Sequence, residues 1–84
     1  YLDCQYNQLT SLDISGCTAL PRLYCGNNQL TSLDLGQNTV LNDLNCEHNQ
    51  LTNLDISGCT ALIYLDCQEN KFDCDALQKV VEKQ

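Results

Sequence analysis

A 21-residue unit recurs along this chain, and the repeat limits its fold more than any other feature does. Four positions of the unit hold the same residue type, or nearly so, in every copy: Leu2, Leu23, Leu44 and Leu65; Cys4, Cys25, Cys46 and Cys67; Asn7, Asn28, Asn49 and Asn70; Leu9, Leu30, Leu51 and Phe72. A fixed period of this length predicts a repeat solenoid, in which each copy forms one coil that stacks on the next. The copies are residues 1–20, 21–41 and 42–62, with a partial copy at 63–72.

Each copy opens with a stretch in which polar and apolar residues alternate. In the first copy, Tyr1-Leu2-Asp3-Cys4 predicts a short strand with Leu2 and Cys4 facing the core. The asparagine that follows, Asn7, is expected to turn inward and to bond backbone groups of its own turn and of the neighbouring coil. Residues 9–20 predict a second extended stretch with a turn at each end. Stacked copies would place the first strands in a parallel β-sheet.

The period ends after Phe72, and a helical pattern follows it. Residues 73–84 carry apolar side chains on one helical face, namely Ala76, Leu77, Val80 and Val81. Asp73 can cap the free amides at the start of such a helix. We therefore expect repeats at 1–72 and a C-terminal capping α-helix at 73–84, which covers the apolar end of the last coil. No matching cap precedes Tyr1, and the start within a repeat leads us to expect a piece of a longer protein.

The charge of the chain restricts its partners. Eleven acidic residues against four basic residues give a net charge of −7. Such a surface repels phosphate groups, so nucleic acid and anionic membranes are not expected as partners. It suits a basic partner or a cation, although acidic residues also simply keep a short apolar solenoid soluble. The chain lacks the continuous apolar run, about 18 residues or longer, that a membrane span requires, so we expect no membrane insertion.

The seven cysteines follow the repeat instead of forming a disulfide framework. Their successive gaps are 13, 8, 21, 13, 8 and 7 residues, and no Cys-x-x-Cys motif occurs. Free cysteine behaves as a small buried hydrophobic residue, and here it stands where leucine would also serve. The spacing predicts a reduced core without structural disulfides.

The pattern Leu20-Pro21-Arg22-Leu23-Tyr24-Cys25-Gly26-Asn27-Asn28-Gln29-Leu30 resembles the consensus of the leucine-rich repeat. The 21-residue length is similar to that of the short repeats in bacterial surface and secreted leucine-rich proteins, including internalins. The resemblance covers residues 1–72 and implies a right-handed solenoid with a parallel sheet on its concave face and short extended segments on its convex side. It also implies a binding protein without catalytic residues or cofactors, which is secreted or displayed at the cell surface.

The outward positions of the first strands are the candidate binding surface. Tyrosine and arginine are enriched among the residues that dominate protein interfaces, and all four tyrosines of the chain fall in these positions. The alternative is that exposed aromatic residues only satisfy the preference of a strand. The candidate protein-binding residues are Tyr1, Asp3, Tyr6, Arg22, Tyr24, Asp43, Asn45, His48, Tyr64 and Asp66.

Three other hypotheses remain beside this one. The regularly spaced Asp13, Asp34 and Asp55 could bind Ca²⁺, but the favoured interpretation is that each accepts hydrogen bonds in its own turn. Cys46 and His48 offer a thiol and an imidazole, but the sequence supplies neither a complete zinc ligand set nor a third catalytic group. The chain could also be a structural piece that forms a homodimer through the open N-terminal edge.

Overall fold

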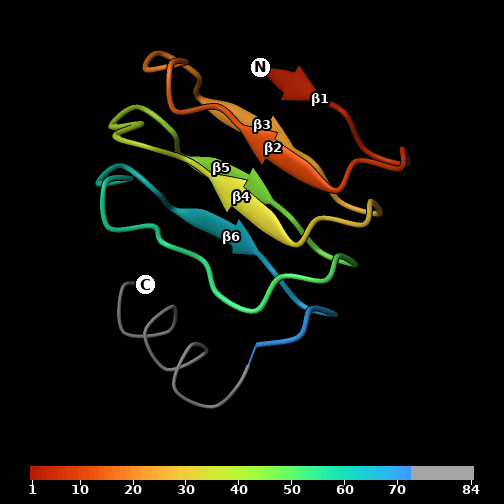
Figure 1. The fold of residues 1–84 in the computed structure, drawn as a ribbon. Helices are drawn as coiled ribbons and strands as arrows, with labels where there is room; N and C mark the ends of the chain where they lie inside the picture. Colours follow the sequence, from red (N-terminus) through yellow and green to blue (C-terminus); the bar gives the residue numbers. More distant parts are fainter. Residues whose placement is uncertain (73–84) are drawn as a thin grey trace.

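The computed structural model describes residues 1–72, which form short parallel strands in two sheets (Figure 1). The larger sheet contains β1 (Leu2–Asp3), β3 (Arg22–Tyr24), β5 (Asp43–Asn45) and β6 (Tyr64–Asp66), in the order β1-β3-β5-β6. The smaller sheet contains β2 (Ser11–Asp13) and β4 (Ser32–Asp34). Residues 1–72 contain no helix, and the capping helix expected at 73–84 lies outside the described residues.

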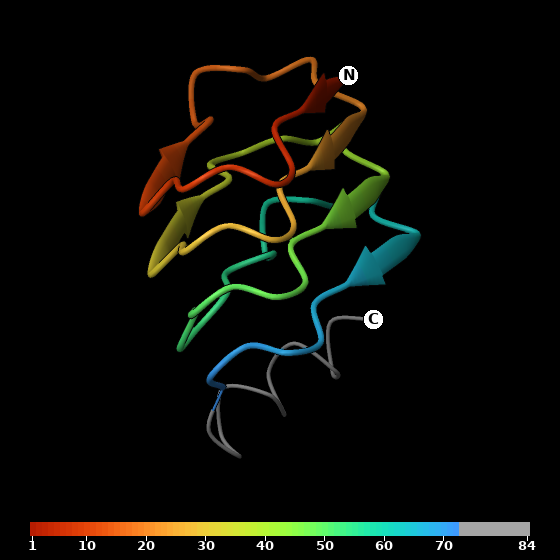
Figure 2. The ribbon, with the colours of Figure 1, turned by 90° about the vertical axis from the view of Figure 1, so that its right-hand side faces the viewer.

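The register of both sheets equals the sequence period. Leu2 pairs with Leu23, Leu23 with Leu44, and Leu44 with Leu65, so each leucine lies opposite its own equivalent in the next copy. In the smaller sheet Leu12 pairs with Leu33 at the same offset. Seen from the side, the two sheets lie on opposite sides of the stacked copies (Figure 2). The expectation of a parallel sheet built from in-register copies is therefore confirmed.

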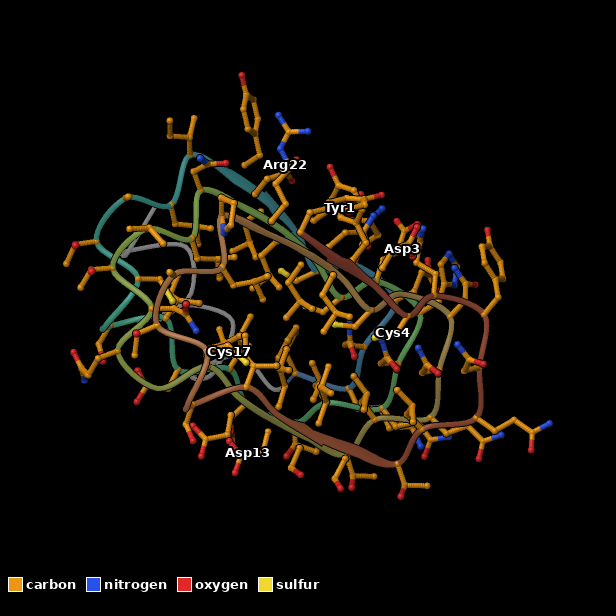
Figure 3. The ribbon with its side chains drawn as sticks, turned by 90° about the horizontal axis from the view of Figure 1, so that it is seen from above. Tyr1, Asp3, Cys4, Asp13, Cys17 and Arg22 are labelled. Atoms are coloured by element: carbon orange, nitrogen blue, oxygen red, sulfur yellow. The ribbon has the colours of Figure 1, made fainter. Side chains whose placement is uncertain are left out.

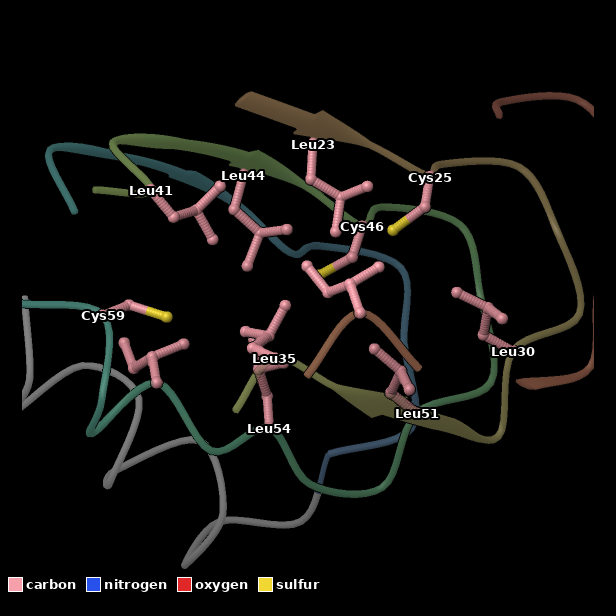
Figure 4. Packing of buried hydrophobic residues seen from close by; sticks show 12 residues of the cluster. Leu23, Cys25, Leu30, Leu35, Leu41, Leu44, Cys46, Leu51, Leu54 and Cys59 are labelled. Atoms are coloured by element: carbon pink, nitrogen blue, oxygen red, sulfur yellow. The ribbon is translucent and has the colours of Figure 1, made fainter. Parts of the chain in front are cut away.

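The core lies between the two sheets and is filled by side chains from the repeated positions (Figure 4). The buried hydrophobic residues are Ile14, Leu23, Cys25, Leu30, Leu35, Leu41, Leu44, Cys46, Leu51, Leu54, Ile56 and Cys59. Leu23 and Leu44 are fully buried, because each has a copy on both sides. Leu2 occupies the same position, yet 36% of it is exposed. Leu2 is therefore less buried than the pattern predicts, because its copy packs against one neighbour only.

A ladder of asparagine side chains joins successive copies along the strand exits. The Asn49 Nδ2 atom donates to the carbonyls of Cys46 (3.0 Å) and Glu47 (3.2 Å) in its own copy, and to Cys25 (3.1 Å) in the preceding copy. Its Oδ1 atom accepts a hydrogen bond from the backbone amide of Leu30 at 3.0 Å. Asn28 and Asn70 make the equivalent bonds. The predicted ladder is confirmed for Asn28, Asn49 and Asn70, and it satisfies backbone groups that the turns would otherwise bury without partners. The expectation for Asn7 is wrong for the neighbouring coil: Asn7 is exposed and bonds only the Cys4 and Gln5 carbonyls of its own copy, because this copy has a neighbour on one side of the stack only.

The turn that follows the second extended stretch of each copy is closed differently in the second copy than in the first and third. In the first and third copies a backbone amide closes this turn, from Cys17 to Ile14 (2.8 Å) and from Cys59 to Ile56 (3.0 Å). In the second copy Gly36 adopts a left-handed conformation with φ of 60°. There the Asn38 side chain replaces the backbone donor, because its Nδ2 atom bonds the Leu35 carbonyl at 3.0 Å. The Asn38 side chain thus supplies the hydrogen-bond donor that the backbone of this turn does not provide.

The thiols of the core are held in their neutral form. Cys25 and Cys46 are buried free thiols, and Cys4 and Cys67 are partly buried free thiols. Burial, with a smaller effect from Cys4, raises the pKa of Cys25 from 9.0 to about 12. Burial also raises the pKa of Cys46 strongly. Both groups therefore serve as packing residues at neutral pH and not as nucleophiles.

We expect alkaline pH to destabilise the protein through these two thiols. Above a pH of about 9 the unfolded chain loses the thiol protons, whereas the folded chain retains them, so stability is complete below this pH and falls above it. The free energy of unfolding should decrease by about 1–2 kcal/mol between about pH 8 and about pH 9.5. Urea titrations at several pH values measure this decrease. A Cys25→Ala/Cys46→Ala variant should show a smaller decrease in stability. The control Cys17→Ala, at an exposed position, should show the same decrease as the parent. Equal decreases in the parent, the double variant and the control would contradict the account.

Candidate functional site

The outward side chains of the larger sheet form one continuous surface, which we call the outer face. Alternation along the strands turns the leucines inward and their sequence neighbours outward. Tyr1, Asp3 and Arg22 lie together on this side of the molecule, and Asp13 lies on the opposite side (Figure 3). Eight of the ten predicted residues belong to the outer face: Tyr1, Asp3, Arg22, Tyr24, Asp43, Asn45, Tyr64 and Asp66.

A depression of about 700 Å³ hollows the outer face over β3, β5 and β6. We call it the outer depression. Five of its lining residues are predicted binding residues, and the other two are Ile63 and Leu65. The complete lining is Tyr24, Asp43, Asn45, Ile63, Tyr64, Leu65 and Asp66. The depression therefore combines aromatic, aliphatic and acidic side chains from three adjacent strands.

Tyr24 forms a fixed wall of the outer depression. Its hydroxyl donates a hydrogen bond of 2.7 Å to the Asp43 Oδ2 atom. Its ring also meets the ring of Tyr1 edge to face, with the centroids 5.4 Å apart and the planes at 84°. The hydrogen bond to Asp43 raises the pKa of Tyr24, because a phenolate would face the carboxylate across that distance. Tyr24 thus stays neutral and oriented, which reduces the entropy that it would lose on binding a partner.

Ile63 and Tyr64 form an exposed apolar pair at the edge of the depression. Ile63 is 67% exposed and Tyr64 is 66% exposed. Sequence reasoning found Tyr64 but missed Ile63, because the equivalent positions hold Pro21 and Asn42 and show no apolar pattern. Strand alternation gave no signal for Ile63, because it places the direct neighbour of an outward tyrosine on the opposite face.

The acidic groups of the depression lack basic partners within the described chain. Asp43 uses one oxygen for Tyr24, and the half-buried carboxylate of Asp66 makes no hydrogen bond or ion pair to any of residues 1–72. Asn45 uses its Oδ1 atom to accept the Glu47 backbone amide at 3.1 Å, which fixes its side chain. Arg22 pairs with Asp43 in the β3–β5 register but lies outside the depression. The lining is therefore negatively charged.

The other two predicted residues, Tyr6 and His48, lie in the turns that follow the strands. Both adopt left-handed backbone conformations, with φ of 58° and 54°, as do Asn27 and Glu69 at the equivalent positions. This conformation is uncommon outside glycine, and it recurs because each turn must lead into the same ladder asparagine. Neither Tyr6 nor His48 lines the outer depression. The structure thus separates these two residues from the other eight.

The alternative sites have structural explanations. Asp13 and Asp34 accept the backbone amides of Ser15 (2.9 Å) and Gly36 (3.1 Å), and Asp55 accepts the Ser57 amide at 2.9 Å. Hydrogen bonds from Ser15 lower the pKa of Asp13. Among residues 1–72 no group of three or more histidine, cysteine, aspartate and glutamate side chains could hold a metal ion. Cys46 is fully buried, whereas His48 is exposed on its turn, so the two do not form a nucleophile and base pair.

Two further findings do not depend on the outer face. No helix within residues 1–72 has the length and apolar character that a membrane span requires. Comparisons with protein families, with curated proteins and with solved structures found no match.

Proposed function

We propose that this chain is a non-catalytic interaction module that binds a protein partner through the outer face. The finer architecture in this proposal is a right-handed solenoid of leucine-rich repeats, with the larger sheet on its concave face and a capping helix at 73–84. The in-register pairing of equivalent leucines and the asparagine ladder support the solenoid. The outer depression is the observation that carries the binding function, because it gathers exposed aromatic and aliphatic side chains in one hollow.

The aromatic and aliphatic side chains of the depression support this proposal. Tyrosine buries a large area with few rotatable bonds and keeps a polar group at its tip, which favours its use at binding hot spots. Tyr64 and Ile63 supply exposed apolar area, and Tyr24 is already held in place by Asp43 and Tyr1. The positions of Leu23 and Cys25 in the core keep their residue type in every copy, while the outward positions of the same strands change from copy to copy. A scaffold with interchangeable surface residues has this distribution.

Removing the exposed apolar pair tests this function. An Ile63→Ala/Tyr64→Ala variant should lose captured proteins from an extract of the cells that produce the chain, with a fall in affinity of about tenfold or more for a direct partner. A Tyr6→Ala/Val40→Ala variant is the matched control, because it also removes an exposed tyrosine and an exposed aliphatic residue, outside the depression. Quantitative mass spectrometry of the captured proteins is the measurement. If the parent and both variants capture the same set, the depression is not the binding site.

Self-assembly through the N-terminal edge is the second candidate function. Strands β1 and β2 are both edge strands, and Leu2 is exposed at the same end of the stack. The Asn7 side chain bonds only the Cys4 and Gln5 carbonyls, so its Oδ1 atom accepts no hydrogen bond from residues 1–72. A hollow of about 390 Å³ at Gly16–Leu20 lies in the same first copy. An edge of this kind favours pairing with a second copy of the chain.

The native mass distinguishes this candidate from a monomer. Light scattering after size exclusion, at several concentrations and under reducing conditions, should give a dimer if the edge is used. A Leu2→Lys variant should then be monomeric, because a charge on an edge strand prevents pairing, whereas Val40→Lys should remain dimeric. A parent protein that is monomeric at every concentration would exclude the second candidate.

A further inference from the structure

We infer that the outer depression binds a cationic side chain, specifically an arginine presented by an extended basic segment of the protein partner. This inference rests on the proposed binding function and names the chemistry of the partner. It starts from the depression itself, a hollow with an aromatic wall, an aliphatic rim and two carboxylates. The lining contains no lysine, arginine or histidine.

The carboxylates supply the first part of the recognition. Asp43 already holds the Tyr24 hydroxyl with Oδ2, and its Oδ1 atom accepts no hydrogen bond within residues 1–72. The carboxylate of Asp66, across β5–β6 from Asn45, likewise has no hydrogen-bonding or ionic partner in the described part of the chain. Both residues are half buried, so solvent screens their charges less than at an open surface. A donor-rich cation from a partner would satisfy both groups.

The aromatic and aliphatic side chains favour arginine over lysine. A guanidinium group is planar and weakly hydrated, stacks on aromatic rings and donates two parallel hydrogen bonds to a carboxylate. Tyr64 offers an exposed ring and Ile63 an exposed alkyl surface for the arginine stem. Lysine would supply charge alone, without the stacking or the paired hydrogen bonds.

Arg22 limits how the basic segment can lie. It is exposed on β3, one strand from Asp43 in the same register row, and outside the depression. The positive charge of Arg22 repels any further cation of the partner that lies next to the arginine in the depression. We therefore expect arginines separated by small neutral residues to bind better than a continuous basic run.

The test uses a fluorescently labelled peptide in which single arginines are separated by Gly-Ser pairs. Its control has the same sequence with citrulline, which keeps the shape of arginine and removes the charge. Fluorescence anisotropy against the full chain, at low and at physiological ionic strength, measures binding. We expect the arginine peptide to bind at least about fivefold more tightly than the citrulline peptide, because charge complementarity contributes to recognition.

Matched variants locate the binding. Asp43→Asn/Asp66→Asn removes two charges and keeps an acceptor for Tyr24, and it should weaken binding of the arginine peptide by about fivefold or more. Asp13→Asn/Asp34→Asn removes the same charge on the smaller sheet and should weaken binding by less than about twofold. Tyr64→Leu should weaken binding by about threefold. Arg22→Gln should strengthen it, since a repelling charge is removed.

Several results would overturn the inference. Equal weakening by the two aspartate pairs would mean that only the net charge acts, and equal binding of the citrulline peptide would mean that no cation is recognised. Failure of the arginine peptide to bind would overturn it as well. If the Ile63→Ala/Tyr64→Ala variant then still lost its captured proteins, the binding function would stand and only the arginine preference would fail. If captured proteins were also unchanged, both proposals would fail.

Discussion

Replacing Asn49 by alanine is expected to lower the free energy of unfolding by about 2–4 kcal/mol. The three carbonyls that Asn49 bonds each keep a second ladder or backbone donor, so their loss is partial. The amide of Leu30 is different, because its only acceptor is the Asn49 Oδ1 atom and it lies in a fully buried residue. The variant thus leaves one buried donor without a partner and removes the side-chain volume around it. Thermal or urea unfolding measures the change, which corresponds to a decrease in melting temperature of roughly 10–25 °C.

Asn7→Ala is the matched control within the same ladder. Asn7 is exposed, bonds only two carbonyls of its own copy, and accepts no amide from residues 1–72. Its replacement should lower the free energy of unfolding by less than about 1 kcal/mol. If Asn7→Ala and Asn49→Ala destabilised the protein equally, the ladder between copies would not be the source of the stability.

Gly58→Ala should destabilise the protein by about 1–3 kcal/mol through a steric conflict between copies. A Cβ atom at this position would lie 2.6 Å from the backbone carbonyl oxygen of Gly36 and 2.9 Å from the Gln37 side-chain oxygen. The side chain could move aside, but the carbonyl belongs to the backbone of the neighbouring copy, so the two copies must separate. Urea unfolding at neutral pH is the measurement.

Gly16 offers the control for this effect, because it stands in the same Ser-Gly-Cys-Thr-Ala-Leu sequence two copies earlier. No atom lies within 4 Å of a Cβ built at Gly16. Gly16→Ala should therefore change the free energy of unfolding by at most about 0.5 kcal/mol. A large loss in Gly16→Ala would indicate that glycine is required by the turn itself and not by the approach of the neighbouring copy.

The repeated positions were predictable because the sequence samples them several times. Leu23 and Asn28 recur at a fixed offset with the same residue type, so their burial and their roles follow from the period alone. The parallel register follows for the same reason, because only a shift by one whole repeat places these side chains together. The end of the stack was less predictable, as Leu2 shows: it satisfies the pattern, but its exposure depends on how many copies surround it.

Features that occur once were missed because the pattern averages over copies. Gly36 and Asn38 replace a Ser-Gly-Cys turn, and their exchange of a backbone donor for a side-chain donor depends on one positive φ angle. Ile63 was not predicted because the equivalent positions in the other copies are not apolar. The position of the depression depends on the sizes of neighbouring outward side chains on β5 and β6, which the alternation pattern does not contain.

The core and the outer face of this chain have separate roles. The asparagine ladder and the buried leucines hold the copies in register, which fixes the spacing of the outer side chains. The outer side chains are then free to differ without disturbing the core, as Arg22, Asp43 and Tyr64 do at one register position. Under the proposed binding function, specificity would therefore change by single substitutions on the outer face at little cost in stability.

Site-specific photo-crosslinking tests the central claim most directly. A benzophenone side chain would replace Tyr64, in the outer depression, and in a second protein Tyr6, which is also exposed but lies on a turn outside it. Irradiation in an extract of the producing cells, followed by mass spectrometry, identifies the proteins within reach of each position. We predict adducts with a distinct partner at position 64 and none of that partner at position 6. Adducts of the same proteins at both positions, or at position 6 alone, would contradict a binding site on the outer face.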